Sequence, residues 1–82
     1  MKVKSISKNQ TVINLDRASV FVSYETPVAA FIEGQGYFRT ETKWSQTTTR
    51  HINKWLGSVD ATEKPQEFFD GLLTAKEITN NI

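Results

Sequence analysis

Apolar and polar residues alternate through much of the first half of this chain, which is the pattern of half-buried β-strands. A β-rich run at 11–15 and a second run at 18–24 are joined by Asp16 and Arg17. These two polar residues form a compact connection suited to a hairpin. We therefore expect the two strands to pair antiparallel.

The strand pattern continues beyond a proline. Pro27 has no N–H group to donate, so the stretch 25–27 should be a bulge, a bend or an edge position, with the strand resuming at 28–33. The Gly-Gln-Gly sequence at 34–36 supplies the backbone freedom of a hairpin loop. A further strand is predicted at 37–44, and its odd-numbered residues, Tyr37 to Lys43, should face water.

Two helices are expected after the strands. Ser45 is a plausible N-cap, Gly57 a C-terminal stop, and Ile52, Trp55 and Leu56 have the spacing of a buried stripe, which together predict a helix over 45–56. Residues 58–63 are expected to be a linker. A second helix with Pro in its first turn is predicted over 65–73, and the chain should fray beyond residue 75.

These elements predict an α+β fold, an antiparallel β-meander of four to five strands with one packed helix and a short C-terminal helix. Residues 1–57 would form the sheet-plus-helix core, and residues 58–82 a linker with a C-terminal helix or tail.

Composition narrows the function classes. The chain has 82 residues and no cysteine, so its core is small and neither a disulfide nor a thiolate metal site is possible. No apolar run is long enough to cross a membrane and no signal peptide is evident, so we expect no membrane contact and a location in the cytoplasm. Residues 1–57 carry eight Lys/Arg against four Asp/Glu, and residues 58–82 two against five. This asymmetry indicates either an anionic partner for the first part or pairing of the acidic tail with the basic part, within or between chains.

The sequence contains few residues that could form a catalytic site. His51 is the only histidine, and the acidic residues are scattered singly, so no triad, carboxylate pair or metal-ligand set is indicated. We expect no catalytic residues, no metal and no cofactor, and predict that the protein is not an enzyme. His51 is interpreted as a boundary residue of the helix with one ring nitrogen hydrogen-bonded.

The start of the predicted helix is the best candidate for an anion site, because free N–H groups and the helix dipole favour negative charge there. Hydroxyl and basic side chains gather around it and could bind a nucleotide or a nucleic acid. The alternative is ordinary capping, with the basic residues solvated. The candidate residues are Lys43, Ser45, Thr47, Thr48, Arg50, His51 and Lys54.

The second helix carries an apolar stripe that either covers the chain's own sheet or binds another copy or a target protein. We expect a homodimer, formed through this stripe or an exposed strand edge. The stripe residues are Phe68, Phe69, Leu72 and Leu73.

Several short segments carry a resemblance: Tyr-Glu-Thr-Pro at 24–27, Lys-Trp-Ser at 43–45, and His-Ile-Asn-Lys-Trp-Leu at 51–56. Over about residues 12–57 the chain resembles a family of small uncharacterised proteins from phages, archaeal viruses and other mobile elements. The resemblance implies an accessory protein acting in the host cytoplasm. Our first expectation is that it binds and inhibits a host protein, such as a defence protein, and the alternative is binding of nucleic acid or a nucleotide.

Overall fold

The computed structural model describes the backbone of residues 2–7 and 9–80 and the side chains of residues 9–73. Within these residues the chain forms six strands and two helices. In chain order they are β1 (Lys2–Ser7), β2 (Gln10–Asn14), β3 (Ala18–Ser23), β4 (Thr26–Ile32), β5 (Gly36–Thr40), α1 (Gln46–Leu56), β6 (Ala61–Lys64) and α2 (Gln66–Asn80).

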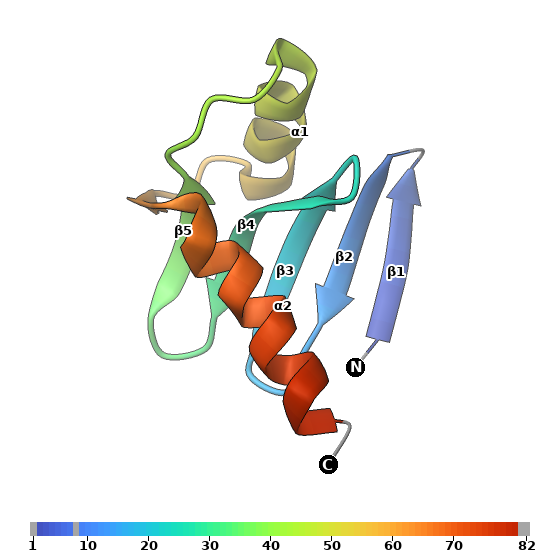
Figure 1. The fold of residues 1–82 in the computed structure, drawn as a ribbon. Helices are drawn as coiled ribbons and strands as arrows, with labels where there is room; N and C mark the ends of the chain where they lie inside the picture. Colours follow the sequence, from blue (N-terminus) through green and yellow to red (C-terminus); the bar gives the residue numbers. More distant parts are fainter. Residues whose placement is uncertain (1, 8, 81–82) are drawn as a thin grey trace.

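All six strands belong to one sheet whose spatial order follows the sequence (Figure 1). Strands β1 to β5 form an antiparallel meander, and β6 returns through α1 to pair parallel with β5. The predicted α+β class and antiparallel meander are therefore confirmed. The loops at 15–17 and 33–35 make the expected hairpins, closed by Leu15 N to Ala18 O at 2.7 Å and by Gln35 N to Ile32 O at 2.9 Å.

Two strands lie where none was predicted. Strand β1 precedes the first expected strand, and β6 occupies the region predicted as a linker. Strand β6 is short and polar, so no alternation marks it in the sequence; it forms because β5 has an open edge beside it. The Lys64 ammonium lies 5.8 Å from the Phe38 ring centroid and 5.6 Å from that of Phe68, which ties β6 to α2.

The chain reverses direction at Tyr24 and Glu25, where the sequence predicted only a bend or bulge before the strand resumed. Their φ angles of 50° and 68° are both positive, as a tight hairpin turn between twisted strands requires. The predicted irregularity near Pro27 is present as well. Val22 pairs with Pro27 and Phe21 with Ala29, so one residue of β4 is left over as a bulge.

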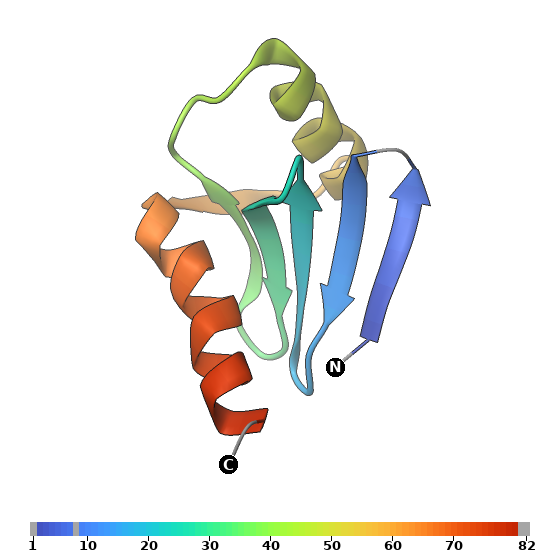
Figure 2. The same cartoon turned by 45° about the vertical axis from the view of Figure 1, so that its right-hand side comes forward.

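The two helices cover opposite faces of the sheet (Figures 1 and 2). Ile52 and Leu56 of α1 pack on Phe21, Val28 and Ala29. On the other face, α2 packs on a cluster formed by Val20, Ala30, Phe38 and Phe69.

The face of β5 that was expected to be wet is partly covered by α1, which corrects that prediction. Trp55 stacks on Phe21 with ring centroids 5.3 Å apart and meets Tyr37 edge-on at 6.1 Å. Arg39 donates a hydrogen bond to Asn53 Oδ1 at 3.1 Å. Strand β5 also ends at Thr40, so residues 41–45 form a loop and not the end of a strand.

Both ends of α1 match the sequence signals. Ser45 caps the helix by accepting a hydrogen bond from Thr48 N at 3.1 Å, and Gly57 closes it with φ 67° and an N–H bond to Asn53 O at 2.9 Å. Helix α2 instead continues to Asn80, beyond its predicted end. The sequence there contains Ala, Lys and Glu, which are good helix formers.

Candidate functional site

The loop before α1 carries an exposed tryptophan that is held in place. Trp44 keeps 47% of its surface accessible, yet its indole Nε1 donates to Gln66 Oε1 at 3.1 Å. An exposed ring without such a partner would sample several rotamers. The hydrogen bond therefore favours one orientation of a large apolar surface that faces solvent.

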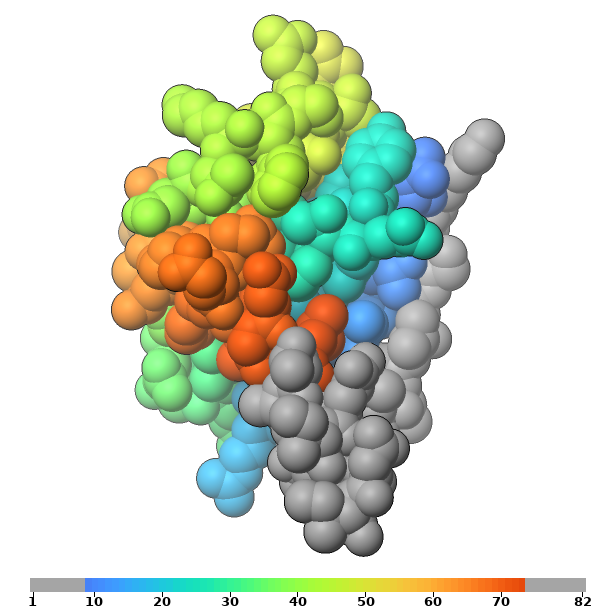
Figure 3. Space-filling view, in the orientation of Figure 1, coloured from blue at the N-terminus to red at the C-terminus, as the bar shows by residue number. Residues whose placement is uncertain are grey.

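Gln66 is in turn fixed by contacts with β4, β5 and its own helix. Its Oε1 also accepts from Thr40 Oγ1 at 2.9 Å, and its Nε2 donates to Pro27 O at 2.6 Å and to Asp70 Oδ1 at 3.2 Å. The space-filling view shows the 41–50 segment, the start of α2 and the β3–β4 hairpin meeting on this side of the molecule (Figure 3). The position of Trp44 is thus set by the tertiary fold.

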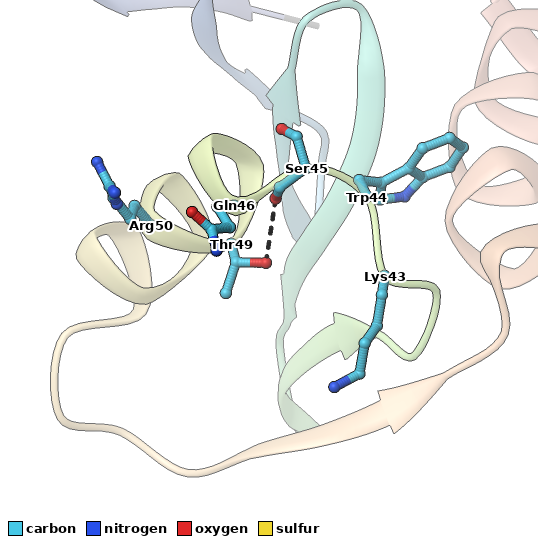
Figure 4. Close-up of a pocket in the computed structure, with 6 residues that line it drawn as sticks. All are labelled: Lys43, Trp44, Ser45, Gln46, Thr49 and Arg50. Carbon is cyan, nitrogen blue, oxygen red and sulfur yellow. Dashed lines mark hydrogen bonds between the residues drawn. The ribbon is translucent and has the colours of Figure 1, made fainter.

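A hollow of about 450 Å³ lies beside Trp44 at the start of α1 (Figure 4). In Figure 4 the side chains of Lys43 and Arg50 lie at opposite ends of this hollow, and Ser45 and Thr49 lie between them, joined by a bond from Thr49 Oγ1 to Ser45 O at 3.3 Å. We call it the basic hollow. Its lining residues are Lys43, Trp44, Ser45, Gln46, Thr49 and Arg50.

The seven anion-site candidates separate into three groups. Lys43, Ser45 and Arg50 line the basic hollow. Thr48 and His51 face the sheet, where they contact Ser23. The other two, Thr47 and Lys54, are exposed and do not line the basic hollow. The helix start therefore shows the capping arrangement, and binding of an anion by the three lining residues stays a prediction.

A chain of hydrogen-bonded hydroxyls runs from the helix cap to His51. Ser45 Oγ donates to Thr48 Oγ1 at 3.3 Å, Thr48 Oγ1 lies 3.4 Å from Ser23 Oγ, and Ser23 Oγ lies 2.9 Å from His51 Nδ1. Ser23 and Thr48 are buried, while His51 is half-buried and its ring stacks on that of Tyr24 at 5.7 Å. The interpretation of His51 as a boundary residue with one bonded nitrogen is confirmed.

The Ser23–His51 pair differs from a nucleophile and its base. In serine hydrolases the serine contacts Nε2 and a carboxylate holds Nδ1, whereas here the serine occupies Nδ1. Ser23 is also only 1% exposed. Among the described residues no carboxylate is hydrogen-bonded to His51, so the pair joins α1 to β3 without an activating partner.

A second, smaller hollow is lined in part by Tyr24 and Trp44. It measures about 170 Å³, and both aromatic side chains are about half exposed, Tyr24 at 48% and Trp44 at 47%. We call it the aromatic hollow. Its lining residues are Ser23, Tyr24, Thr26, Trp44, Ser45 and Thr48.

Sequence reasoning missed three residues of this region. Tyr24 was assigned to a strand, Ser23 was not linked to His51, and Gln66 was given no role. Ser23 and His51 are 28 residues apart, and Gln66 and Trp44 are 22 apart, so no local pattern brings either pair together. Trp44 was assigned to the end of a predicted strand, so only the hydroxyl and basic residues of the predicted helix start pointed to this region.

The apolar stripe of α2 packs on the chain's own sheet. Phe69 is fully buried against Val20, Ala30 and Phe38, and Phe68, Leu72 and Leu73 pack around the same cluster. Of the two interpretations left open, the structure shows the intramolecular one. These four residues therefore have a role in the chain's own core, and a role of the half-buried Phe68, Leu72 and Leu73 in an interface stays a prediction.

Among the described residues, no group of three or more His, Cys, Asp or Glu side chains is placed to hold a metal ion. Neither described helix has the length and apolar character needed to cross a membrane.

Comparison with known proteins places the chain in a family. Residues 1–71 match the model of a family of unknown function, DUF8033, and the chain belongs to this family. The match extends beyond the 12–57 region of the resemblance and includes β6 and the start of α2. No curated protein and no solved structure matches the chain.

Proposed function

We propose that this chain is a non-catalytic binding protein that recognises another protein through the surface around the start of α1. The observation that carries the proposal is the exposed Trp44 ring, held in one orientation by Gln66. We call this surface the binding face. It comprises the exposed side chains of Tyr24, Lys43, Trp44 and Arg50.

The residue types of the binding face are those that dominate protein interfaces. Trp, Tyr and Arg are enriched among the residues whose truncation costs most binding energy. A rigid aromatic side chain loses little conformational entropy when a partner covers it, so more of its contact energy appears as affinity. Trp44 meets this condition through Gln66, and Tyr24 through its stacking on His51.

The identity of the partner is the second part of the proposal. We propose that it is a host protein whose activity the chain inhibits in the host cytoplasm. The resemblance to small proteins of phages and other mobile elements supports this part. This support comes from similarity to other proteins and is independent of the structural argument from Trp44.

A second candidate function is the binding of a nucleotide or a nucleic acid. One observation favours it: Lys43, Trp44 and Arg50 line the same hollow of about 450 Å³. Pockets for small ligands have volumes of about 300–1,000 Å³. An aromatic ring for a base and two cations for phosphate are the groups that such a ligand needs.

The test is affinity purification from a bacterial lysate, with and without nuclease, using the native chain and Trp44→Ala. We expect a specific protein to be retained after nuclease and to be lost with Trp44→Ala. Val59→Ala is the matched control, because Val59 is a similarly exposed apolar residue, at 43%, outside the binding face. Retention of the same proteins by Trp44→Ala would contradict the proposal.

Salt dependence separates the two functions. Nucleic-acid binding falls steeply with salt, and Lys43→Ala and Arg50→Ala would each reduce the salt slope by about one unit if each residue neutralises one phosphate. Protein binding should depend less on salt, with these variants changing mainly the association rate. Arg17→Ala is the control, since Arg17 is an exposed cation in the β2–β3 turn.

A further inference from the structure

The aromatic hollow has walls that are formed before any ligand arrives. One wall is Trp44, held by Gln66 at 3.1 Å. The other is Tyr24, whose ring stacks on His51 at 5.7 Å, while His51 is bonded to Ser23 at 2.9 Å. Tyr24 also lies in a turn with φ 50°, which fixes where its side chain leaves the backbone. Two exposed rings from distant segments thus line one small space.

The lining of this hollow is neutral and rich in hydroxyl groups. None of its six residues is charged, and four of them carry aliphatic hydroxyls. Ser23 and Thr48 each have two hydrogen-bond partners. Because a hydroxyl can take part in three hydrogen bonds, each can form one more with a ligand. The Thr26 hydroxyl makes no hydrogen bond to any other residue that the structure describes, and it is half-buried.

The size of the hollow limits what can enter. Its volume is about 170 Å³. An engineered protein cavity of about 150 Å³ accepts one benzene ring, so this space fits a single six-membered ring. Aromatic walls favour a ring with a flat face, and a hydroxyl lining favours a polar edge on that ring. No charged residue lines the hollow, so a phosphate, carboxylate or guanidinium group would find no opposite charge there.

We propose that the aromatic hollow receives a tyrosine side chain of the partner protein. The ring would pack against Tyr24 and Trp44, and its hydroxyl would bond to Thr26 and to the buried hydroxyls of Ser23 and Thr48. This inference rests on the proposed function and specifies the residue by which the partner is recognised. Burying an amphipathic ring of this kind is common at protein interfaces.

The experiment uses small probes and two-dimensional NMR of the isotopically labelled chain. N-acetyl-tyrosinamide should shift the indole N–H signal of Trp44 with a millimolar Kd and leave that of Trp55 unchanged. N-acetyl-phenylalaninamide should bind about two- to tenfold more weakly, because it leaves the Thr26 hydroxyl unpaired. Methyl glucoside and uridine test whether the aromatic hollow binds a sugar ring or a nucleoside in place of a tyrosine ring.

Variants separate the hydroxyl effect from loss of folding. Thr26→Val should remove the preference for tyrosinamide, whereas Thr47→Val, at an exposed position that lines neither hollow, should keep it; thermal melts of both confirm that the fold is intact. Equal binding of the two amides, absence of any Trp44 shift, or tighter binding of the glucoside or uridine overturns the inference. If a partner protein is captured but binds Thr26→Val as tightly as the native chain, the inference fails while the proposed function stands.

Discussion

The side-chain oxygen of Gln66 accepts a hydrogen bond from the indole nitrogen of Trp44 at 3.1 Å. The same amide bonds to the Thr40 hydroxyl and the Pro27 carbonyl. One side chain at the start of α2 therefore joins β4, β5 and the loop before α1. Because Thr40 and Pro27 are buried, water cannot easily replace these bonds.

Gln66→Ala should lower the free energy of unfolding by about 1–3 kcal/mol, the cost of leaving buried polar groups without partners. It should also let the Trp44 ring move, which NMR relaxation of the indole N–H would detect. Gln46→Ala is the control, since Gln46 is an exposed glutamine at the start of α1. Equal stability of the two variants in urea unfolding would mean that Gln66 has no such role.

Two glycines should respond in opposite ways to the same substitution. Gly57 ends α1 at φ 67°, whereas Gly71 lies inside α2 with open space around the position of a Cβ atom. Gly57→Ala should therefore destabilise the protein by about 1 kcal/mol, and Gly71→Ala should stabilise it by about 0.5–1 kcal/mol. Thermal melts measure both signs. Stabilisation by Gly57→Ala would contradict the observed end of α1.

The end of α1 at Gly57 is one of the parts of the fold that the sequence could predict. Helix α1 was predictable because Ser45 and Gly57 act within one turn of the helix ends. Strand β6 was not, because it is polar and forms only beside β5. The turn at Tyr24 lacks the Asn-Gly or Asp-Gly signal of its type, so the reversal could not be seen.

The candidate site was predictable only in part, for a related reason. The sequence located the helix start and its hydroxyl and basic residues, because these are neighbours along the chain. It gave no indication that Thr48 and His51 would turn toward Ser23, since that contact depends on how α1 crosses β3. Side-chain contacts between distant elements need the tertiary structure.

Both helices should be essential to the core, since they cover opposite faces of the sheet. Trp55→Ala removes the ring of α1 that stacks on Phe21. Phe69→Ala removes a fully buried ring of α2. Each should cost about 3–5 kcal/mol, most of the stability of so small a domain. Val59→Ala, at an exposed position, is the control for apolar truncation. An unchanged cooperative melt in either variant would remove that helix from the core.

Self-association is expected through a strand edge, now that the α2 stripe packs on its own sheet. In the order of the sheet, β1 and β6 are the outer strands, and an outer strand presents unpaired N–H and C=O groups. Light scattering over a range of concentrations should show a dimer that dissociates on dilution. A constant monomer mass at the highest concentration would contradict this prediction.

We predict that the chain has no hydrolytic activity, despite the 2.9 Å contact between Ser23 and His51. Ser23 is 1% exposed and is hydrogen-bonded to His51 at Nδ1, so the pair should stabilise the fold instead. His51→Ala should destabilise it by about 1–3 kcal/mol, because Ser23 loses a buried partner. His51→Asn should recover part of this loss, since its side-chain amide can either donate to or accept from the Ser23 hydroxyl.

Activity assays with an activated ester, nucleotides and nucleic acids test the catalytic alternative directly. The native chain should show no turnover above the buffer background. Ser23→Ala and His51→Ala distinguish a contaminant from the chain itself, because a contaminating enzyme would survive both substitutions. Turnover that disappears in both variants, while urea unfolding shows that they are still folded, would make Ser23 and His51 a catalytic pair. Activity would then have to proceed with the serine on Nδ1 and without an orienting carboxylate, which ordinary nucleophilic catalysis by serine does not do.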